Sequence, residues 1–155
     1  DLGATSRGVQ ALGNYAYVVT DNTTAEFQVI DMTTLTSPIL LATVDLPGSV
    51  AANELDLFGD RAYVITANNS TGSEFHVVDV ADPVAPSVSG SVDLGNGGNA
   101  IEMNGTTAMI ATVTNDQRHQ ARTRIAGRLE SKVTFICFLA AKAHRDGVLL
   151  DYAQH

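Results

Sequence analysis

Lysine is absent from the first 117 residues, tryptophan is absent from the whole chain, and cysteine occurs once among 155 residues. A single cysteine, Cys137, excludes an intrachain disulfide, and its place in the run VTFICFLAA predicts a small buried apolar side chain. That run is far shorter than the ~18–20 residues needed to cross a bilayer. The opening DLGATSRG lacks the basic start and apolar core of a signal peptide, so we expect a mature or processed chain.

Positive charge is also scarce before residue 118. Residues 1–117 hold 14 acidic residues against two basic ones, Arg7 and Arg61, whereas residues 118–155 hold three acidic and seven basic residues. An acidic body repels nucleic acid, which excludes it as an expected partner. The basic tail contains acids and an apolar run, which favours something other than a nucleic-acid arm.

Catalytic motifs are missing as well. There is no Gly-x-Ser-x-Gly elbow, phosphate loop, His-Glu-x-x-His or paired Cys/His ligand set, and no helix follows the glycine-rich stretch at 95–100. His76 has glutamine, Gln28, at the matching place of the other repeat, which argues against catalysis or ligation. The chain is therefore predicted to be no enzyme, with no catalytic residue, no metal site and no cofactor.

The acidic residues recur in pairs, Glu26 with Asp31 and Glu74 with Asp79. Repetition favours a structural role, because a catalytic residue is normally needed once. The stretch TDNTTAE at 20–26 approaches a Ca²⁺ ligand pattern, but the second copy has lost the carboxylate of Asp21. The pairs are therefore interpreted as structural.

What the chain does contain is a repeat. GNYAYVVT at Gly13 returns as GDRAYVIT at Gly59 and, more weakly, as GTTAMIAT at Gly105, each 46 residues on. Two extra residues lie in the second copy at the turn NNSTGS, after which the match continues. An insertion confined to a turn is what a repeated supersecondary unit tolerates.

Each unit has the pattern of four short strands. An alternating piece (RGVQAL, NELDLF or NAIEMN) precedes a β-branched and aromatic strand, a third strand follows an Asn/Thr/Ser/Gly turn, and a fourth follows a proline. No sustained helical periodicity occurs in residues 1–117. The predicted fold class is all-β, with four-stranded antiparallel β-propeller-type blades, about two and a half repeats of ~46 residues.

The turns carry residues with defined conformational roles. Glycine between the first and second strands suits a positive φ, aspartate at the end of the third strand accepts backbone N–H groups, and the following proline fixes φ. These positions form the repeat signature: Gly13, Tyr17, Asp31 and Pro38; Gly59, Tyr63, Asp79 and Pro86; and Gly105.

The stretches FQVIDMTTLTSP and FHVVDVADPVAP resemble the LVIVD repeat, and GNYAYVVTD is similar to the strand that precedes it. The resemblance covers roughly residues 1–115 and leaves the tail unmatched. It implies a β-propeller, a secreted or cell-surface location, and no shared catalytic residues.

Two domains of different character follow. The repeat region is predicted at 1–117, with blades at about 7–46 and 52–94 and a partial blade at about 98–116; residues 118–155 form a basic C-terminal extension. The extension fits three interpretations: a cap with some helix near 121–130 and 136–145, a shifted reading frame or engineered join, or VTFICFLA as the last strand of a degraded third blade. The chain starts in mid-repeat, as in a propeller that closes with both termini or in a fragment of a longer array.

Two and a half blades cannot close a ring, which needs at least ~4. We therefore expect a non-enzymatic extracellular or cell-surface structural and interaction module that associates with itself or with other propeller or surface proteins. The alternatives are a carbohydrate-binding (lectin-like) propeller module with glycans as ligands, at the turns 21–26 and 67–74, and a fragment of a larger surface propeller protein. Four sequons mark possible N-glycosylation, at Asn22, Asn68, Asn69 and Asn104.

Overall fold

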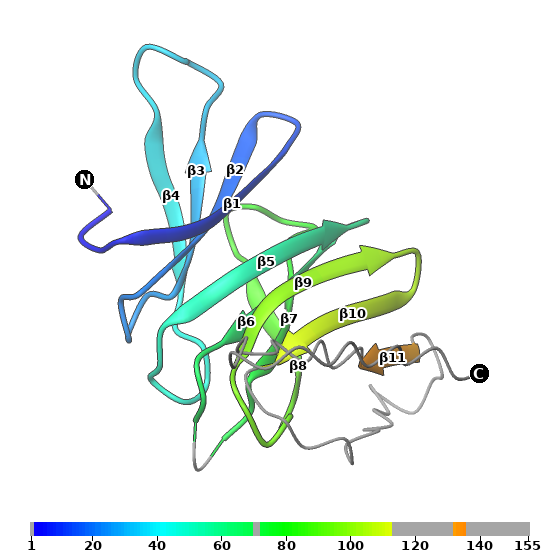
Figure 1. The fold of residues 1–155 in the computed structure, drawn as a ribbon. Helices are drawn as coiled ribbons and strands as arrows, with labels where there is room; N and C mark the ends of the chain where they lie inside the picture. Colours follow the sequence, from blue (N-terminus) through cyan, green and yellow to red (C-terminus); the bar gives the residue numbers. More distant parts are fainter. Residues whose placement is uncertain (1, 70–71, 113–131, 136–155) are drawn as a thin grey trace, which may run out of the picture.

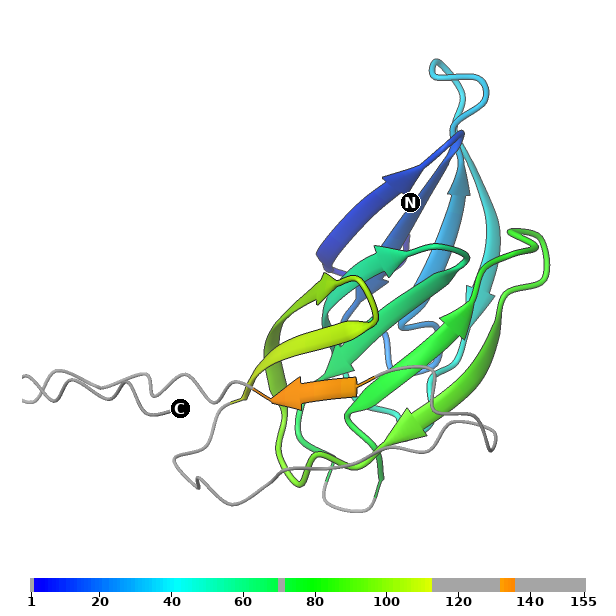
Figure 2. The same ribbon diagram turned by 90° about the vertical axis from the view of Figure 1, so that its right-hand side faces the viewer.

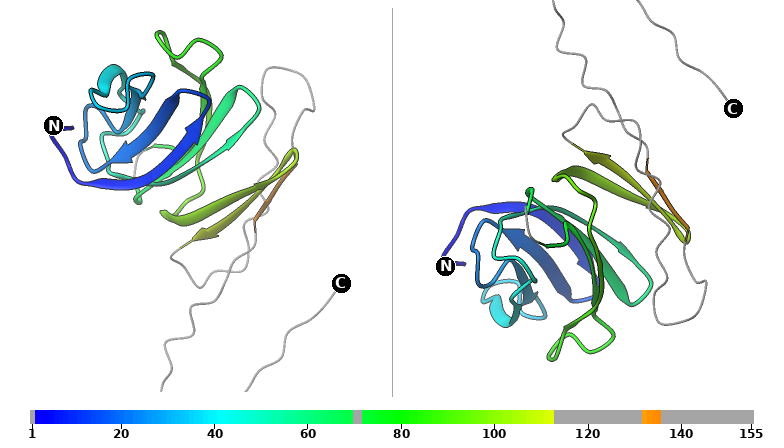
Figure 3. Two further views of the ribbon diagram at one scale, coloured as in Figure 1. Left: turned by 90° about the horizontal axis from the view of Figure 1, so that it is seen from above. Right: turned by 90° about the horizontal axis from the view of Figure 1, so that it is seen from below.

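The computed structural model describes residues 2–69, 72–112 and 132–135. They form eleven strands in three sheets, which fan out side by side (Figures 1, 2 and 3). The strands are β1 (Ser6–Leu12), β2 (Tyr15–Thr20), β3 (Phe27–Asp31), β4 (Ile39–Val44), β5 (Ala52–Phe58), β6 (Arg61–Thr66), β7 (Phe75–Asp79), β8 (Ser87–Val92), β9 (Gly98–Asn104), β10 (Thr107–Thr112) and β11 (Lys132–Phe135). The predicted all-β class is confirmed.

Two sheets are complete four-stranded antiparallel meanders, in the orders β1-β2-β3-β4 and β5-β6-β7-β8. We call them blade 1 and blade 2, and the sheet of β9, β10 and β11 blade 3. Their registers coincide after a shift of 46 residues in the first hairpin: Val9 pairs with Val18 as Leu55 pairs with Val64. The repeat in the sequence is therefore a repeat of strand register.

Blade 3 repeats only the first hairpin. β9 pairs with β10 antiparallel, with Ile101 opposite Ile110. β11 joins the other edge of β10, but in parallel, whereas the third strand of blades 1 and 2 is antiparallel to the second. The strand expected within VTFICFLA thus exists over residues 133–135, with a different direction from that of a regular blade. The other interpretations of the tail concern residues outside the described part.

The hairpin turns that join the first two strands of each blade need glycine. Gly13, Gly59 and Gly105 have φ of 60°, 60° and 59°, in the left-handed region that residues with a Cβ rarely adopt. At the end of the third strand, Asp31 Oδ1 accepts the N–H of Thr33 at 2.8 Å, and Asp79 Oδ1 accepts that of Ala81 at 3.0 Å. The signature residues of the repeat thus fix its turns.

The core lies between the blades rather than within any one of them. One face of blade 1 packs against one face of blade 2, and the other face of blade 2 packs against blade 3. Each interface is anchored by an aromatic pair, Tyr17 with Phe27 at a ring-centroid distance of 6.0 Å and Tyr63 with Phe75 at 6.2 Å. The strands β1, β5 and β9 lie next to one another and form the inner row (Figure 1).

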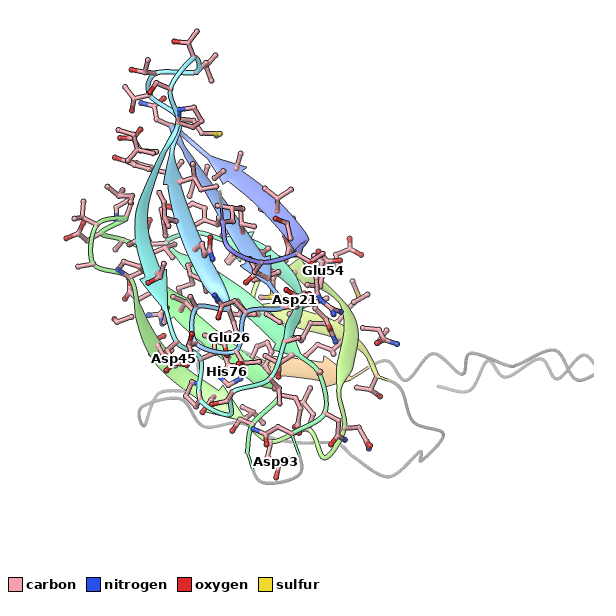
Figure 4. The ribbon with its side chains drawn as sticks, turned by 90° about the vertical axis from the view of Figure 1, so that its left-hand side faces the viewer. Asp21, Glu26, Asp45, Glu54, His76 and Asp93 are labelled. Atoms are coloured by element: carbon pink, nitrogen blue, oxygen red, sulfur yellow. The ribbon has the colours of Figure 1, made fainter. Side chains whose placement is uncertain are left out.

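Each complete blade also buries one glutamate just before its third strand. Glu26 Oε2 accepts the N–H of Leu46 at 2.9 Å, and Glu74 Oε2 accepts that of Leu94 at 2.8 Å. The longer turn of blade 2 supplies a second donor, the N–H of Asn69, to Glu74 Oε1 at 3.1 Å. Glu26 Oε1 is buried and has no hydrogen-bond partner among the described residues, and burial raises the pKa of Glu26 (Figure 4).

This difference predicts opposite responses to removal of the charge. Glu74→Gln replaces one of two acceptor oxygens with an NH₂ group facing a buried N–H, which should cost about 1–3 kcal/mol of unfolding free energy at pH 7. Glu26→Gln keeps the acceptor for Leu46 and removes a buried charge that is only half satisfied, so stability should stay level or rise. Urea unfolding of both variants measures this, and equal losses in the two would contradict it.

Candidate interaction surface

A blade has two faces, and in this chain they differ in composition. The face that blades 1 and 2 turn toward the following blade carries the aromatic pair: Tyr17, Val19, Phe27 and Val29 in blade 1, and Tyr63, Ile65, Phe75 and Val77 in blade 2. The face turned toward the preceding blade carries smaller aliphatic residues: Leu55, Ala62, Val64 and Val78 in blade 2, and Ile101, Ala108 and Ile110 in blade 3. Alternation along each strand separates the two sets.

Blade 1 has this second face too, but no described blade covers it. We call it the open face: Val9, Ala16 and Val18 match Leu55, Ala62 and Val64 in register, but Ala16 and Val18 are only 5% and 4% exposed, so Val9 is its accessible residue. Val9 is 65% exposed, whereas Leu55 is 1% exposed and its counterpart Ile101 in blade 3 is 9% exposed. The same position is thus buried in two blades and open in the first.

Part of this side of blade 1 is covered by the chain itself. Gln28, in β3, is buried, and its Nε2 donates to the carbonyl of Leu2 at 3.1 Å and to that of Ala25 at 3.3 Å. The N-terminal segment therefore covers the third strand, while Val9 on the inner strand remains uncovered. The accessible apolar part of the open face lies on β1.

His76 occupies the place of Gln28 in blade 2 and lies on the face that meets blade 1 (Figure 4). Its side chain is fully buried, and neither ring nitrogen has a hydrogen bond of ordinary geometry to a described residue. Burial lowers the pKa of His76 to about 4, and the backbone of Ser73 opposes this only in part. The residue is neutral and structural at physiological pH.

The candidate metal ligands of the first turn have other hydrogen-bond partners. Asp21 Oδ1 accepts the N–H of Thr5 at 2.9 Å, which holds the pKa of Asp21 below its usual value. Asn22 Oδ1 accepts both the N–H and the hydroxyl of Thr24 at 3.0 Å. Among the described residues, no group of three or more His, Cys, Asp or Glu side chains could hold a metal ion.

The sequons lie in different environments. Asn104 and Asn68 are exposed, Asn22 is half-buried, and Asn69 is only 8% exposed. The turns considered for sugar binding present no aromatic side chain in residues 21–26, 67–69 and 72–73. The lectin-like alternative stays a prediction, and these turns offer no aromatic ring on which a sugar could stack.

Sequence reasoning missed the polar residues of the inner strands. Gln10, Asp56 and Glu102 occupy one register position, 46 residues apart. Gln10 Nε2 donates to Asp56 Oδ1 at 3.0 Å, so this position links blade 1 to blade 2. No motif marks these residues, but the shared spacing was a signal, because polar groups recur there at the repeat period.

The stacked four-stranded meanders, with their inner strands side by side, define a protein built from β-propeller-type blades. The family model of the LVIVD repeat matches residues 3–46 and 51–94, which is more than half of the chain. The chain belongs to the LVIVD repeat family. A search of curated proteins finds no match. In the described part of the chain, no helix is long and apolar enough to span a membrane.

The buried histidine predicts acid sensitivity. The unfolded chain binds a proton at His76 near pH 6.5 and the folded chain only near pH 4, so stability should fall as pH drops through this range. The loss at pH 4 should approach about 3 kcal/mol. His76→Gln, the side chain that blade 1 has at this position, should flatten this part of the profile. Urea unfolding between pH 4.5 and 7 tests it, and parallel profiles for the two proteins would contradict it.

Proposed function

We propose that the chain is a non-enzymatic structural and interaction module that contributes its blades to a larger β-propeller-type assembly at the outside of the cell. The observation that supports this most is the exposure of Val9, at a position that is buried in blades 2 and 3. A docking partner at the open face would extend a packing arrangement that the chain already contains twice. Each blade in such a stack is stabilised by burial against its neighbours.

The apolar character of the open face supports docking rather than hydration. Val9 is 65% exposed on β1, whereas its register neighbours Ala16 and Val18 in β2 are already buried at 5% and 4%. Covering the exposed side of Val9 adds hydrophobic stabilisation of about 25 cal/mol per Å² of apolar area. The unpaired edges of the sheets give further sites for strand addition.

The non-enzymatic part of the proposal rests on what the recurring acids do. Glu26 and Glu74 bind backbone N–H groups inside the blades, and Asp31 and Asp79 cap turns. Their repetition follows from their structural contacts. We propose no reaction for them.

The extracellular location is supported by the sequons at exposed positions. Asn104 is the last residue of β9 and Asn68 follows β6, and both are exposed. Glycans attached at these two sites would extend from opposite ends of the strands, because Asn104 adjoins the β9–β10 hairpin and Asn68 begins the β6–β7 connection. Asn69 is buried beside the Glu74 carboxylate, so a glycan there would disturb the fold.

Self-association provides the first test of this function. Size-exclusion chromatography with light scattering should give a species larger than the 16.3 kDa chain. Val9→Lys should lower the mass toward that of the monomer, because it places a charge in the docking surface. Val84→Lys is the matched control, since Val84 is 64% exposed but lies in the turn before β8. A wild-type monomer, or equal effects of the two changes, would refute the proposal.

Glycosylation provides the second test. Secreted from a eukaryotic host, the chain should lose mass on treatment with an N-glycosidase. Asn104→Gln should remove one glycan, and Asn69→Gln should leave the number of glycans unchanged. An intact mass that does not respond to the enzyme would count against the extracellular location.

A further inference from the structure

A ladder of polar contacts crosses the inner strands of the three blades. Asp56 is its central member: its Oδ1 accepts from Gln10 Nε2 of blade 1 at 3.0 Å, and its Oδ2 accepts the N–H of Met103 of blade 3 at 2.6 Å. Each contact joins one blade to the next along the chain. The carboxylate therefore ties the two interfaces together and fixes their register.

A second rung runs parallel to the first. Arg7 Nη1 donates to Asn53 Oδ1 at 3.2 Å, and Asn53 Nδ2 donates to the carbonyl of Gly98 at 2.8 Å. Arg7, Asn53 and Asn99 each lie at a register irregularity of their inner strand. These three positions are equivalent in the repeat, so the strands present the three side chains in the same way. The ladder is thus a repeating feature of the inner row.

The two ends of the ladder are chemically different. At the blade 1 end stand Arg7 and Gln10, whose guanidinium and amide carry more N–H donors than their contacts to Asn53 and Asp56 use. At the blade 3 end stand Asn99 and Glu102, the register partners of Asn53 and Asp56, both exposed. The Arg7 guanidinium can only donate and the Glu102 carboxylate can only accept, which makes the two ends complementary to each other.

A face-to-face arrangement of two blade 1 surfaces fits this chemistry poorly. It would bring two Arg7 guanidinium groups and two Gln10 amides together, and the Asp21 carboxylate near each Arg7 already accepts the N–H of Thr5 in its own chain. The head-to-tail arrangement instead gives Gln10 the Glu102 carboxylate of a neighbour. This contact would use the same register position as the Gln10–Asp56 contact, with the acceptor on the preceding blade instead of the following one.

The apolar surfaces agree with the polar ones. On the outward side of β10, Met109 and Ala111 are half-buried and take the places that Tyr63 and Ile65 hold in blade 2. Such a surface is suited to the small aliphatic face that each blade turns toward its predecessor. The open face is a face of this kind, and Val9 is its accessible residue.

We propose that a second copy of the chain docks its blade 3 onto the open face of blade 1, with Glu102 accepting from Gln10 and Asn99 from Arg7. The proposal rests on the proposed function, since it names the occupant of the same surface. Its interface is heterologous, so copies add in one direction until a ring closes or a filament grows.

Complementation between two one-sided variants tests this directly. Val9→Lys places a charge on the open face. Glu102→Lys replaces the proposed carboxylate acceptor with an ammonium group, which repels Arg7 and cannot accept a hydrogen bond from Gln10. Each variant alone should have its Kd for self-association raised at least tenfold, measured by sedimentation velocity. Mixed in equal amounts, they should form a 1:1 dimer that grows no further, because each variant keeps one intact surface. Asp45→Lys, with the same change of charge just after β4, should behave like the wild type.

The other outcomes separate the two proposals. If Val9→Lys blocks association and Glu102→Lys does not, head-to-tail docking is wrong while the open face keeps its role. If neither variant affects association, both proposals are wrong. A mixture that forms no dimer also overturns head-to-tail docking, provided that circular dichroism shows both variants folded. Should Val9→Lys fail to fold, Val9→Gln takes its place in the same mixture.

Discussion

A four-stranded antiparallel sheet cannot bury both of its faces alone, and this constraint governs the whole chain. The core residues of blades 1 and 2 meet across an interface, and those of blades 2 and 3 meet across another. The aromatic pair on one blade packs on the aliphatic face of the next. Stability therefore resides in contacts between repeats, and in the first blade Val9 is left exposed with no described blade packed against it.

Polar contacts give this packing its direction and register. Asp56 links the inner strands of three blades, while the buried carboxylates of Glu26 and Glu74 bind the backbone inside their own blades. The two glutamates occupy equivalent places, yet the longer turn of blade 2 satisfies its glutamate more completely. The difference in turn length between the two blades thus decides which buried glutamate can be replaced without loss of stability.

The sequence predicted most of the fold because each repeat contains turn residues and strand patterns at fixed positions. Gly13 and Gly59 mark hairpins at a fixed spacing, and the continuous β-branched and aromatic runs YAYVVT and RAYVIT mark buried strands. The candidate surface was harder to predict, because Val9 and Leu55 are both aliphatic and share one register position, and only the structure shows that Val9 is 65% exposed and Leu55 1%. The direction of β11 had no signal either, since it depends on pairing over a long separation in sequence.

The central claim is that blade 1 docks a further blade at its open face, and electron microscopy of the purified chain tests it most directly. The account predicts particles that contain several copies, with blades side by side around a common axis or along a filament, and β1 of each copy covered by a neighbour. Uniform particles of a single 16.3 kDa chain, at concentrations well above those used for chromatography, would contradict it.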